Sequence, residues 1–264
     1  MNESMRIHLL ASGLLPWVLL FGMLVMGEIG WRIGRYCSVT RKVSRTAASD
    51  TFVAAIFGML ALLIAFTFSG ASDRYDQRRE LIVKEMLTIG TAYMSVDLLN
   101  QEDQPRIREL FKSYLDHRIT LYQNAVDTAA LEARFQAQSE LGNQLWQAAV
   151  KAVKETGDTQ KLVAAQILPA ISTMFDAFDE QRMAMKLHPP PIVWQALMLL
   201  ALIGSLLSGY NMGIEQKRDW ILALVFIVLM AGAIYVILNL EFPRLGNINL
   251  DEFEHELIAL RKSM

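Results

Sequence analysis

Bulky apolar side chains recur every four residues inside an uncharged segment, residues 51–69. At this spacing Leu60, Ile64 and Phe68 share one face of a predicted helix. In a ring of subunits such a ridge forms an apolar constriction that gates ion flow by dewetting. The polar candidates for the mouth of this pore follow along the chain: Thr67, Ser69, Ser72, Arg74 and Arg78. A bulky ridge is also the usual surface of a lipid-facing or core-facing helix, so both interpretations stand.

Glu28 lies near the end of the first apolar segment of the chain. A carboxylate within a membrane span is a functional candidate, because burying a charge in lipid is costly. Arg32 follows one helical turn later, so an ion pair at the membrane interface is the simpler interpretation. Glu28 is also the single feature that supports a small transporter, the weakest of the functions considered. Gly30 and Gly34 beside it would let another helix backbone approach closely.

Motifs for catalysis, phosphate binding and metal binding are missing from the sequence. There is no glycine-rich phosphate loop, no Gly-x-Ser-x-Gly elbow and no His-Glu-x-x-His. His8, His117, His188 and His255 show no metal-ligand spacing, and the single cysteine, Cys37, excludes an intrachain disulfide or a cysteine-based metal site. A net charge of −2 gives no case for nucleic-acid binding. We therefore expect no catalytic residue, no metal and no cofactor, and the chain is not predicted to be an enzyme.

Four apolar segments account for the hydrophobic excess of the chain. They cover residues 9–29, 51–69, 192–212 and 220–240, and each is long enough to cross the hydrocarbon core of a bilayer. A cleaved signal peptide is the competing interpretation of the first segment, but its cleavage pattern is poor and its apolar run is long. A retained span is therefore predicted. Between the second and third segments lie about 120 residues of soluble composition.

The second apolar segment continues without a proline through Gly70 as a charged, helix-favouring stretch that ends at Leu99. Helical spacing of apolar residues predicts further helices over residues 105–125, 127–156 and 158–187. An amphipathic stretch over residues 250–260 is expected to pack on this soluble part. The predicted fold is all-α, with four transmembrane helices and a helical module between the second and third spans. The predicted divisions are 1–70, 71–188 (a stalk over 71–99 plus three helices), 189–242 and 243–264.

The third span carries a ridge of small residues, Ala201, Ser205, Gly209 and Gly213, which predicts a close-packing face. The loop over residues 31–50 holds five Lys and Arg residues, and the segment after the second span holds four in a comparable window. This balance leaves membrane sidedness open. An even number of spans nevertheless puts both termini and the middle module on one side.

Several stretches together resemble a known family. They are Ala65-Phe-Thr-Phe-Ser-Gly70, Arg74-Tyr-Asp76, Arg78-Arg79, Ile89-Gly-Thr-Ala-Tyr93, Asp97-Leu-Leu99, Pro190-Pro191 with Trp194, Ser208-Gly209-Tyr210, and Pro243-Arg244 followed by Gly246. This composite pattern is similar to that of the bestrophin-like domain proteins, bacterial membrane proteins of largely undefined activity. The similarity is weak over residues 1–50 and 127–166.

Bestrophins, to which that family is distantly similar, are pentameric anion channels with four spans per subunit and a large cytosolic helical region. The resemblance implies a homo-oligomeric ring in a bacterial inner membrane, with the second helix lining a pore for small anions. Leu60, Ile64 and Phe68 would then stand where bestrophins carry an apolar neck. It also favours a cytoplasmic middle module. The calcium-binding acidic cluster of bestrophins has no match in this sequence, so calcium gating is not implied.

Two functions from different classes follow. The first is an oligomeric, bestrophin-like anion channel whose partners are the lipid bilayer, further copies of the chain and small ions. The second is a non-conducting membrane scaffold or sensor whose helical module binds a partner protein.

Overall fold

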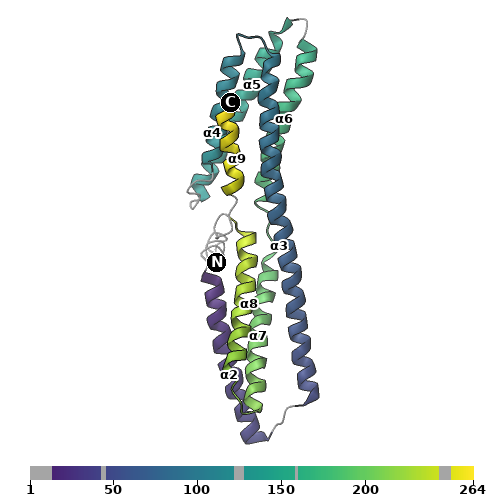
Figure 1. Ribbon diagram of the computed structural model, residues 1–264, viewed down its shortest axis with the longest axis vertical. Helices are drawn as coiled ribbons and strands as arrows, with labels where there is room; N and C mark the ends of the chain where they lie inside the picture. Colours follow the sequence, from purple (N-terminus) through teal and green to yellow (C-terminus); the bar gives the residue numbers. More distant parts are fainter. Residues whose placement is uncertain (1–13, 43–45, 122–127, 158–159, 244–250) are drawn as a thin grey trace. The chain divides into compact units, whose positions relative to one another are not determined.

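The computed structural model describes residues 14–42, 46–121, 128–157, 160–243 and 251–264. Within these ranges the chain is helical and has no strand, which confirms the all-α prediction (Figure 1). The helices are α2 (Leu14–Arg41), α3 (Ala47–Ser95), the short 3-10 helix η1 (Val96–Leu98), α4 (Gln104–Thr120), α5 (Thr128–Lys154), α6 (Gln160–Ala184), α7 (Pro191–Ile214), α8 (Trp220–Glu241) and α9 (Asp251–Ser263). The predicted helix starts at residues 9, 127, 158 and 250 lie outside the described residues.

Helix α3 is one uninterrupted helix of 49 residues. It passes through Gly70 without a break, as the absence of proline predicts. The chain divides into two compact units, with boundaries at Tyr75 on α3 and before His188. Unit 1 contains α2, the N-terminal part of α3, α7 and α8, and unit 2 contains the rest of α3, η1, α4, α5, α6 and α9.

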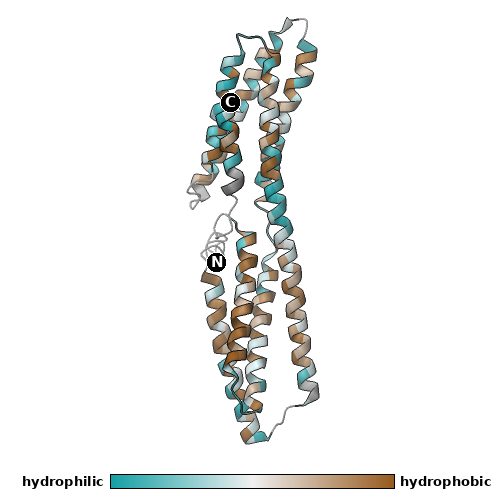
Figure 2. Ribbon diagram, viewed as in Figure 1, coloured by the Kyte–Doolittle hydropathy of each residue, from teal (hydrophilic) through white to brown (hydrophobic). Residues whose placement is uncertain are grey.

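Five of the described helices, α2, α3, α6, α7 and α8, are long and apolar enough to cross a membrane. Figure 2 shows the brown of apolar residues concentrated on α2, α8 and the N-terminal part of α3, while α4 is largely teal. The chain is therefore a multi-pass membrane protein. The sequence predicted four spans, and α6 is the additional helix that meets the criteria of length and composition.

Backbone contact between α2 and α7 holds the centre of unit 1. A Cβ added at Gly30 would lie 2.0 Å from the carbonyl oxygen of Leu206, and one at Gly209 would lie 2.0 Å from that of Gly27. Only glycine allows this approach, because a side chain at either position would overlap the facing backbone. Ser205 adds a hydrogen bond across the same interface by donating to the carbonyl of Met23 at 2.5 Å. The small-residue faces predicted on the first and third spans are thus partners of each other.

The remaining core of unit 1 is aliphatic and aromatic. Phe57 on α3 meets Phe226 on α8 edge to face, with ring centroids 5.0 Å apart. The same cluster buries the following residues: Leu19, Met23, Leu60, Ala71, Trp194, Leu197, Ala201, Ile227, Ile234, Ile237 and Leu238. Helix α3 is therefore packed on one face within unit 1.

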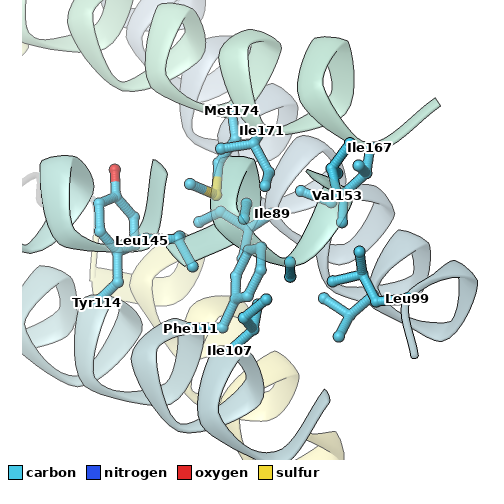
Figure 3. Packing of buried hydrophobic residues seen from close by; sticks show 14 of the residues in the cluster. Ile89, Leu99, Ile107, Phe111, Tyr114, Leu145, Val153, Ile167, Ile171 and Met174 are labelled. Atoms are coloured by element: carbon cyan, nitrogen blue, oxygen red, sulfur yellow. The ribbon is translucent and has the colours of Figure 1, made fainter. Parts of the chain in front are cut away.

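Unit 2 has a separate apolar core, to which α3, η1, α4, α5, α6 and α9 all contribute. Figure 3 shows its centre, where Phe111, Leu145 and Ile171 point toward one another. On α6 the buried positions Ile167, Ile171 and Met174 recur at helical spacing, so the apolar face of this amphipathic helix covers the core.

A buried ion pair joins three helices of unit 2. Arg118 on α4 donates to both carboxylate oxygens of Glu85 on α3, at 2.6 and 2.7 Å, and both side chains are fully buried. Arg118 also donates to the amide oxygen of Gln181 on α6 at 3.0 Å. Burial of two charges is tolerated because their paired geometry replaces the lost hydration.

Helix α9 packs on unit 2, as its amphipathic pattern predicts. Leu257 is completely buried in the core of this unit. Arg261 makes a two-point ion pair with Asp116 at 2.7 and 2.9 Å, and the Tyr93 hydroxyl donates to the carbonyl of Met264 at 2.9 Å.

Replacing Gly30 with alanine is expected to destabilise unit 1, because the added Cβ would overlap the backbone of α7. The cost should reach the upper end of the usual range for overpacking, about 3 kcal/mol or more. The matched control is Gly232→Ala, since a Cβ at Gly232 meets nothing within 4 Å. Thermal unfolding of the purified proteins in detergent measures both. Equal midpoints for Gly30→Ala and the parent protein would contradict the close-packed interface.

Glu85→Gln is expected to lower the stability of unit 2 by about 3–5 kcal/mol, because it leaves the guanidinium of Arg118 buried without a counter-charge. Glu109→Gln is the control, since Glu109 is 72% exposed in a one-turn pair with Lys112 and should contribute less than about 1 kcal/mol. Chemical unfolding followed by tryptophan fluorescence compares the two variants. A similar small effect from both would show that Glu85 and Arg118 are solvated.

Candidate pore helix and its charged exit

The part of α3 in unit 1 carries the predicted neck residues, and the three differ in exposure. Leu60 is 1% exposed and lies within the core of unit 1. Ile64 is partly buried against the same cluster, whereas Phe68 is 45% exposed. Buried Leu60, Thr67 and Ala71 follow one another at helical spacing, so this face of α3 covers the core of unit 1.

The opposite face of this part of α3 is uncovered and consists mainly of small residues. Ala55, Gly58, Leu62 and Ser69 are all exposed at helical spacing. A Cβ added at Gly58 meets nothing within 4 Å. In membranes, faces of this composition allow helices to approach closely. Within the described residues, nothing covers this face of α3.

The predicted polar residues near the end of this segment have different environments. The Thr67 hydroxyl is buried and donates to the carbonyl of Leu63 at 2.6 Å, one turn earlier in the same helix. Ser69 is exposed and Ser72 is half-buried. Of the three hydroxyl-bearing residues, the exposed Ser69 is thus the most accessible to solvent or ligand, and Thr67 is engaged within α3.

Arg74 forms a buried charge cluster at the C-terminal end of α8. Its guanidinium donates to one carboxylate oxygen of Glu241 from Nε at 2.9 Å and from Nη2 at 2.8 Å. The carboxylate is fully buried, and its second oxygen accepts from His188 Nδ1 at 2.9 Å. The His188 ring stacks on Phe242 with centroids 4.8 Å apart. The cluster ties together α3, the segment before α7 and the end of α8.

Arg78, which lies in unit 2, supports the C-terminal end of α6. Its side chain is 2% exposed, and it donates to the carbonyls of Ala184 and Leu187 at 3.4 and 3.0 Å. The last carbonyls of a helix lack partners within the helix and carry partial negative charge, so a guanidinium there is stabilising. Arg78 therefore stabilises the C-terminal end of α6 within unit 2.

Glu28 is paired as its spacing suggests, and it has a second partner. It accepts from Arg32 at 2.9 Å and from Arg218 at 3.3 and 3.4 Å. The guanidinium of Arg218 lies 3.3 Å from the ring centroid of Trp31 and 5.0 Å from that of Trp220. This combination of ion pairs and cation–π contacts links α2 to the α7–α8 turn. These contacts give Glu28 a role in packing α2 against the α7–α8 turn within unit 1.

Glu241 and His188 are not among the residues predicted from sequence for the candidate site. An acid at the end of a long apolar run was the available signal for Glu241, because such a charge requires a partner. Nothing local identifies its partners, since Arg74 and His188 lie 167 and 53 residues away in the chain. In the part of the chain that the structure describes, no three His, Cys, Asp or Glu side chains gather as a metal site requires.

A family model for the bestrophin-like domain matches residues 21–252 of the chain, which is most of its length. No curated protein and no solved structure matches the chain.

Glu241→Gln is expected to loosen the cluster at the end of α8, because the amide cannot balance the charge of Arg74. The expected loss of stability is about 3 kcal/mol, the lower end for breaking a buried pair, since Arg74 is partly exposed and can turn toward water. Glu28→Gln is the control in the same unit and should cost less, because Arg32 is 74% exposed. Thermal unfolding in detergent gives both values. A larger loss for Glu28→Gln would contradict the structural role of Glu241.

Proposed function

We propose that this chain, which belongs to the bestrophin-like domain family, forms a homo-oligomeric ion channel with α3 lining the pore. A ring of subunits in a bacterial inner membrane, pentameric as in bestrophins, would bring several copies of α3 around one axis. The observation that carries the proposal is that α3 packs on the core of unit 1 through Leu60 and leaves Phe68 45% exposed. We propose a channel rather than an enzyme, and no catalytic residue is assigned.

We further propose that four of the five apolar helices cross the membrane: α2, α3, α7 and α8. Helix α6 has the lowest mean hydropathy of the five. Its apolar face already covers the core of unit 2, and its exposed face carries Lys161, Asp176 and Glu180. A span by α6 would place these charges in lipid at high cost. Four spans put the middle module and both termini on one side, which the resemblance to bestrophins makes the cytoplasm.

Phe68 is the accessible member of the proposed neck. Its side chain is 45% exposed, so in a ring it can approach its counterparts in other subunits. Ile64 lies one turn earlier and is partly buried, and Leu60 is enclosed by the core of its own subunit. We propose that Phe68 forms the narrowest ring, that Ile64 borders it, and that Leu60 holds α3 in place beneath both. A ring of bulky apolar side chains closes a pore by excluding water.

The proposed selectivity for small anions comes from the family resemblance. Both arginines predicted at the mouth are engaged in the subunit, Arg74 with Glu241 and Arg78 with the end of α6. Their charges are therefore partly balanced before any ion arrives. The exposed hydroxyl of Ser69 is the polar group of the proposed mouth that has the most access to a passing ion.

Conductance of the purified protein in planar bilayers tests the proposal. Phe68→Ala should raise single-channel current several-fold or make the channel leak, because it removes the ring that excludes water. Met59→Ala is the matched control, since Met59 is 61% exposed on the same helix but lies on the side opposite Phe68. The reversal potential in a salt gradient reports whether anions or cations carry the current.

Three results would overturn the channel. One is a silent bilayer with verified insertion, the second is a monomer in mild detergent, and the third is an equal response to Phe68→Ala and Met59→Ala. The first two would support the alternative function, a non-conducting scaffold or sensor whose helical module binds a partner protein.

A further inference from the structure

Unit 2 contains a recess of about 180 Å³ between α4, α5 and α6. A cavity needs about 10–15 Å³ to hold one water molecule, so this recess has room for a small organic solute. Aromatic rings, uncharged polar groups and one acid line the recess. The lining includes Tyr114, Gln138, Gly142, Asn143, Phe178 and Asp179. The recess lies outside the apolar helices assigned to the membrane, and conduction does not require it.

Aromatic faces form one side of the recess. The rings of Tyr114 and Phe175 lie with centroids 6.1 Å apart and planes inclined by 53°. Phe178, one turn further along α6, also lines the recess and is 5% exposed. Gly142 of α5 lies opposite, where an added Cβ would come within 3.2 Å of Phe175. The inclined rings and the absent side chain leave a hollow with aromatic rings along one side, and the face of an aromatic ring attracts cations. Arg118 already lies 5.9 Å from the ring centroid of Phe178.

A buried hydroxyl borders this hollow. Tyr114 is 2% exposed, and Figure 3 shows its ring at the margin of the apolar cluster, with the hydroxyl pointing away from Phe111 and Ile107. Burial and, after it, the nearby carboxylate of Glu85 raise the pKa of Tyr114 well above its ordinary value. The hydroxyl therefore stays protonated at physiological pH and can donate a hydrogen bond.

The neighbouring amide of Gln138 is already engaged. Its oxygen pairs with His117 Nδ1 at 2.7 Å, and its nitrogen donates to the backbone carbonyl of Tyr114 at 3.4 Å. These two hydrogen bonds hold the Gln138 side chain in place beside the recess. The amide of Asn143, which also lines the recess, is exposed and makes no hydrogen bond to the rest of the described chain. The Tyr114 side chain also hydrogen-bonds that of Gln138, and its O–H remains able to donate. The polar groups that can contact a solute are therefore the Tyr114 hydroxyl, the exposed Ser139 hydroxyl and the Asn143 amide.

The charge at the recess is negative. Asp179 is exposed at its edge and has no ion-pair partner among the described residues. Arg118, which lies over the Phe178 ring, is balanced by Glu85 with both side chains fully buried. Arg182, further along α6, is paired with Glu132. A cation entering the recess would meet the uncompensated carboxylate of Asp179, while an anion would be repelled by it.

We propose that this recess of the helical module binds a small organic cation of the ammonium class. The cationic head lies against Asp179 and the aromatic faces, and a hydroxyl or carbonyl on the same solute bonds to Tyr114 and Asn143. Aromatic walls combined with one carboxylate favour a substituted ammonium over a metal ion, because the rings offer no lone pairs for coordination.

Calorimetric titration of the full-length protein in detergent tests the site with choline and tetramethylammonium. Both should bind, and sodium at the same concentration should not compete. Asp179→Asn should weaken both by about tenfold or more, because it removes the charge that faces the ammonium. Asp176→Asn is the matched control, an exposed acid on the same helix that does not line the recess, and it should change affinity less than about twofold. Equal losses from the two variants would mean general surface attraction and would overturn the site.

The hydroxyl contact has its own test, because choline carries a hydroxyl and tetramethylammonium does not. Tyr114→Phe should weaken choline by about two- to tenfold and leave tetramethylammonium unchanged, as expected for the loss of one neutral hydrogen bond. Thermal unfolding of this variant checks that the core is intact. Heat from neither probe in the parent protein, or from choline and acetate alike, would overturn the proposal. These outcomes are independent of whether the protein conducts ions.

Discussion

The backbone contact between α2 and α7 is the constraint on which unit 1 depends. In a membrane, association of helices gains little from the hydrophobic effect, because lipid chains are as apolar as the side chains they would replace. Close approach at Gly30 and Gly209 provides packing in its place, and the Ser205–Met23 hydrogen bond adds a polar contact. That bond joins residues 182 apart in the sequence. Helices α2 and α7 are thus brought together although the residues of unit 2 lie between them in the sequence.

In each of the two units, a buried carboxylate pairs with an arginine from another helix. Glu85 and Glu241 are both fully buried. Glu85 accepts two hydrogen bonds from Arg118, and Glu241 accepts three from Arg74. Such pairs add little net stability compared with apolar packing, but removing one partner leaves an uncompensated charge. They therefore select one arrangement of helices over others of similar hydrophobic content. In unit 1 the pair fixes α3 to the end of α8, so the face of α3 that remains exposed is determined by a specific contact.

The helices were largely predictable from sequence because their signals are local. Periodic apolar residues and the absence of proline predicted one helix through Gly70, and small-residue spacing identified the faces of α2 and α7 that make contact. Residue spacing could not show that the small-residue face of α2 contacts that of α7, because pairing between distant segments has no local signature. For the same reason the partners of Glu241 were missed. Leu60 shows a further limit, since a ridge at i, i+4 spacing is the same pattern whether it covers a core or lines a pore.

Helix α6 illustrates that composition alone does not separate a membrane span from a helix that covers a core. Its run of apolar residues meets the criteria for a span, yet Ile167, Ile171 and Met174 are buried among the other helices of unit 2. An amphipathic helix that covers a large core and a helix that contacts lipid can have the same average hydropathy. The distinction depends on the distribution of its charges around the helix axis, and it is visible only once the neighbouring helices are known.

The half-buried Cys37 on α2 makes the protein convenient to label. It is the single thiol among 264 residues, so a maleimide dye or nitroxide attaches once per chain without any background of other sites. In an assembly, the number of bleaching steps then equals the number of chains, and spin–spin distances between identical positions report its symmetry. One native side chain thereby gives a direct reading of stoichiometry without any substitution in the protein.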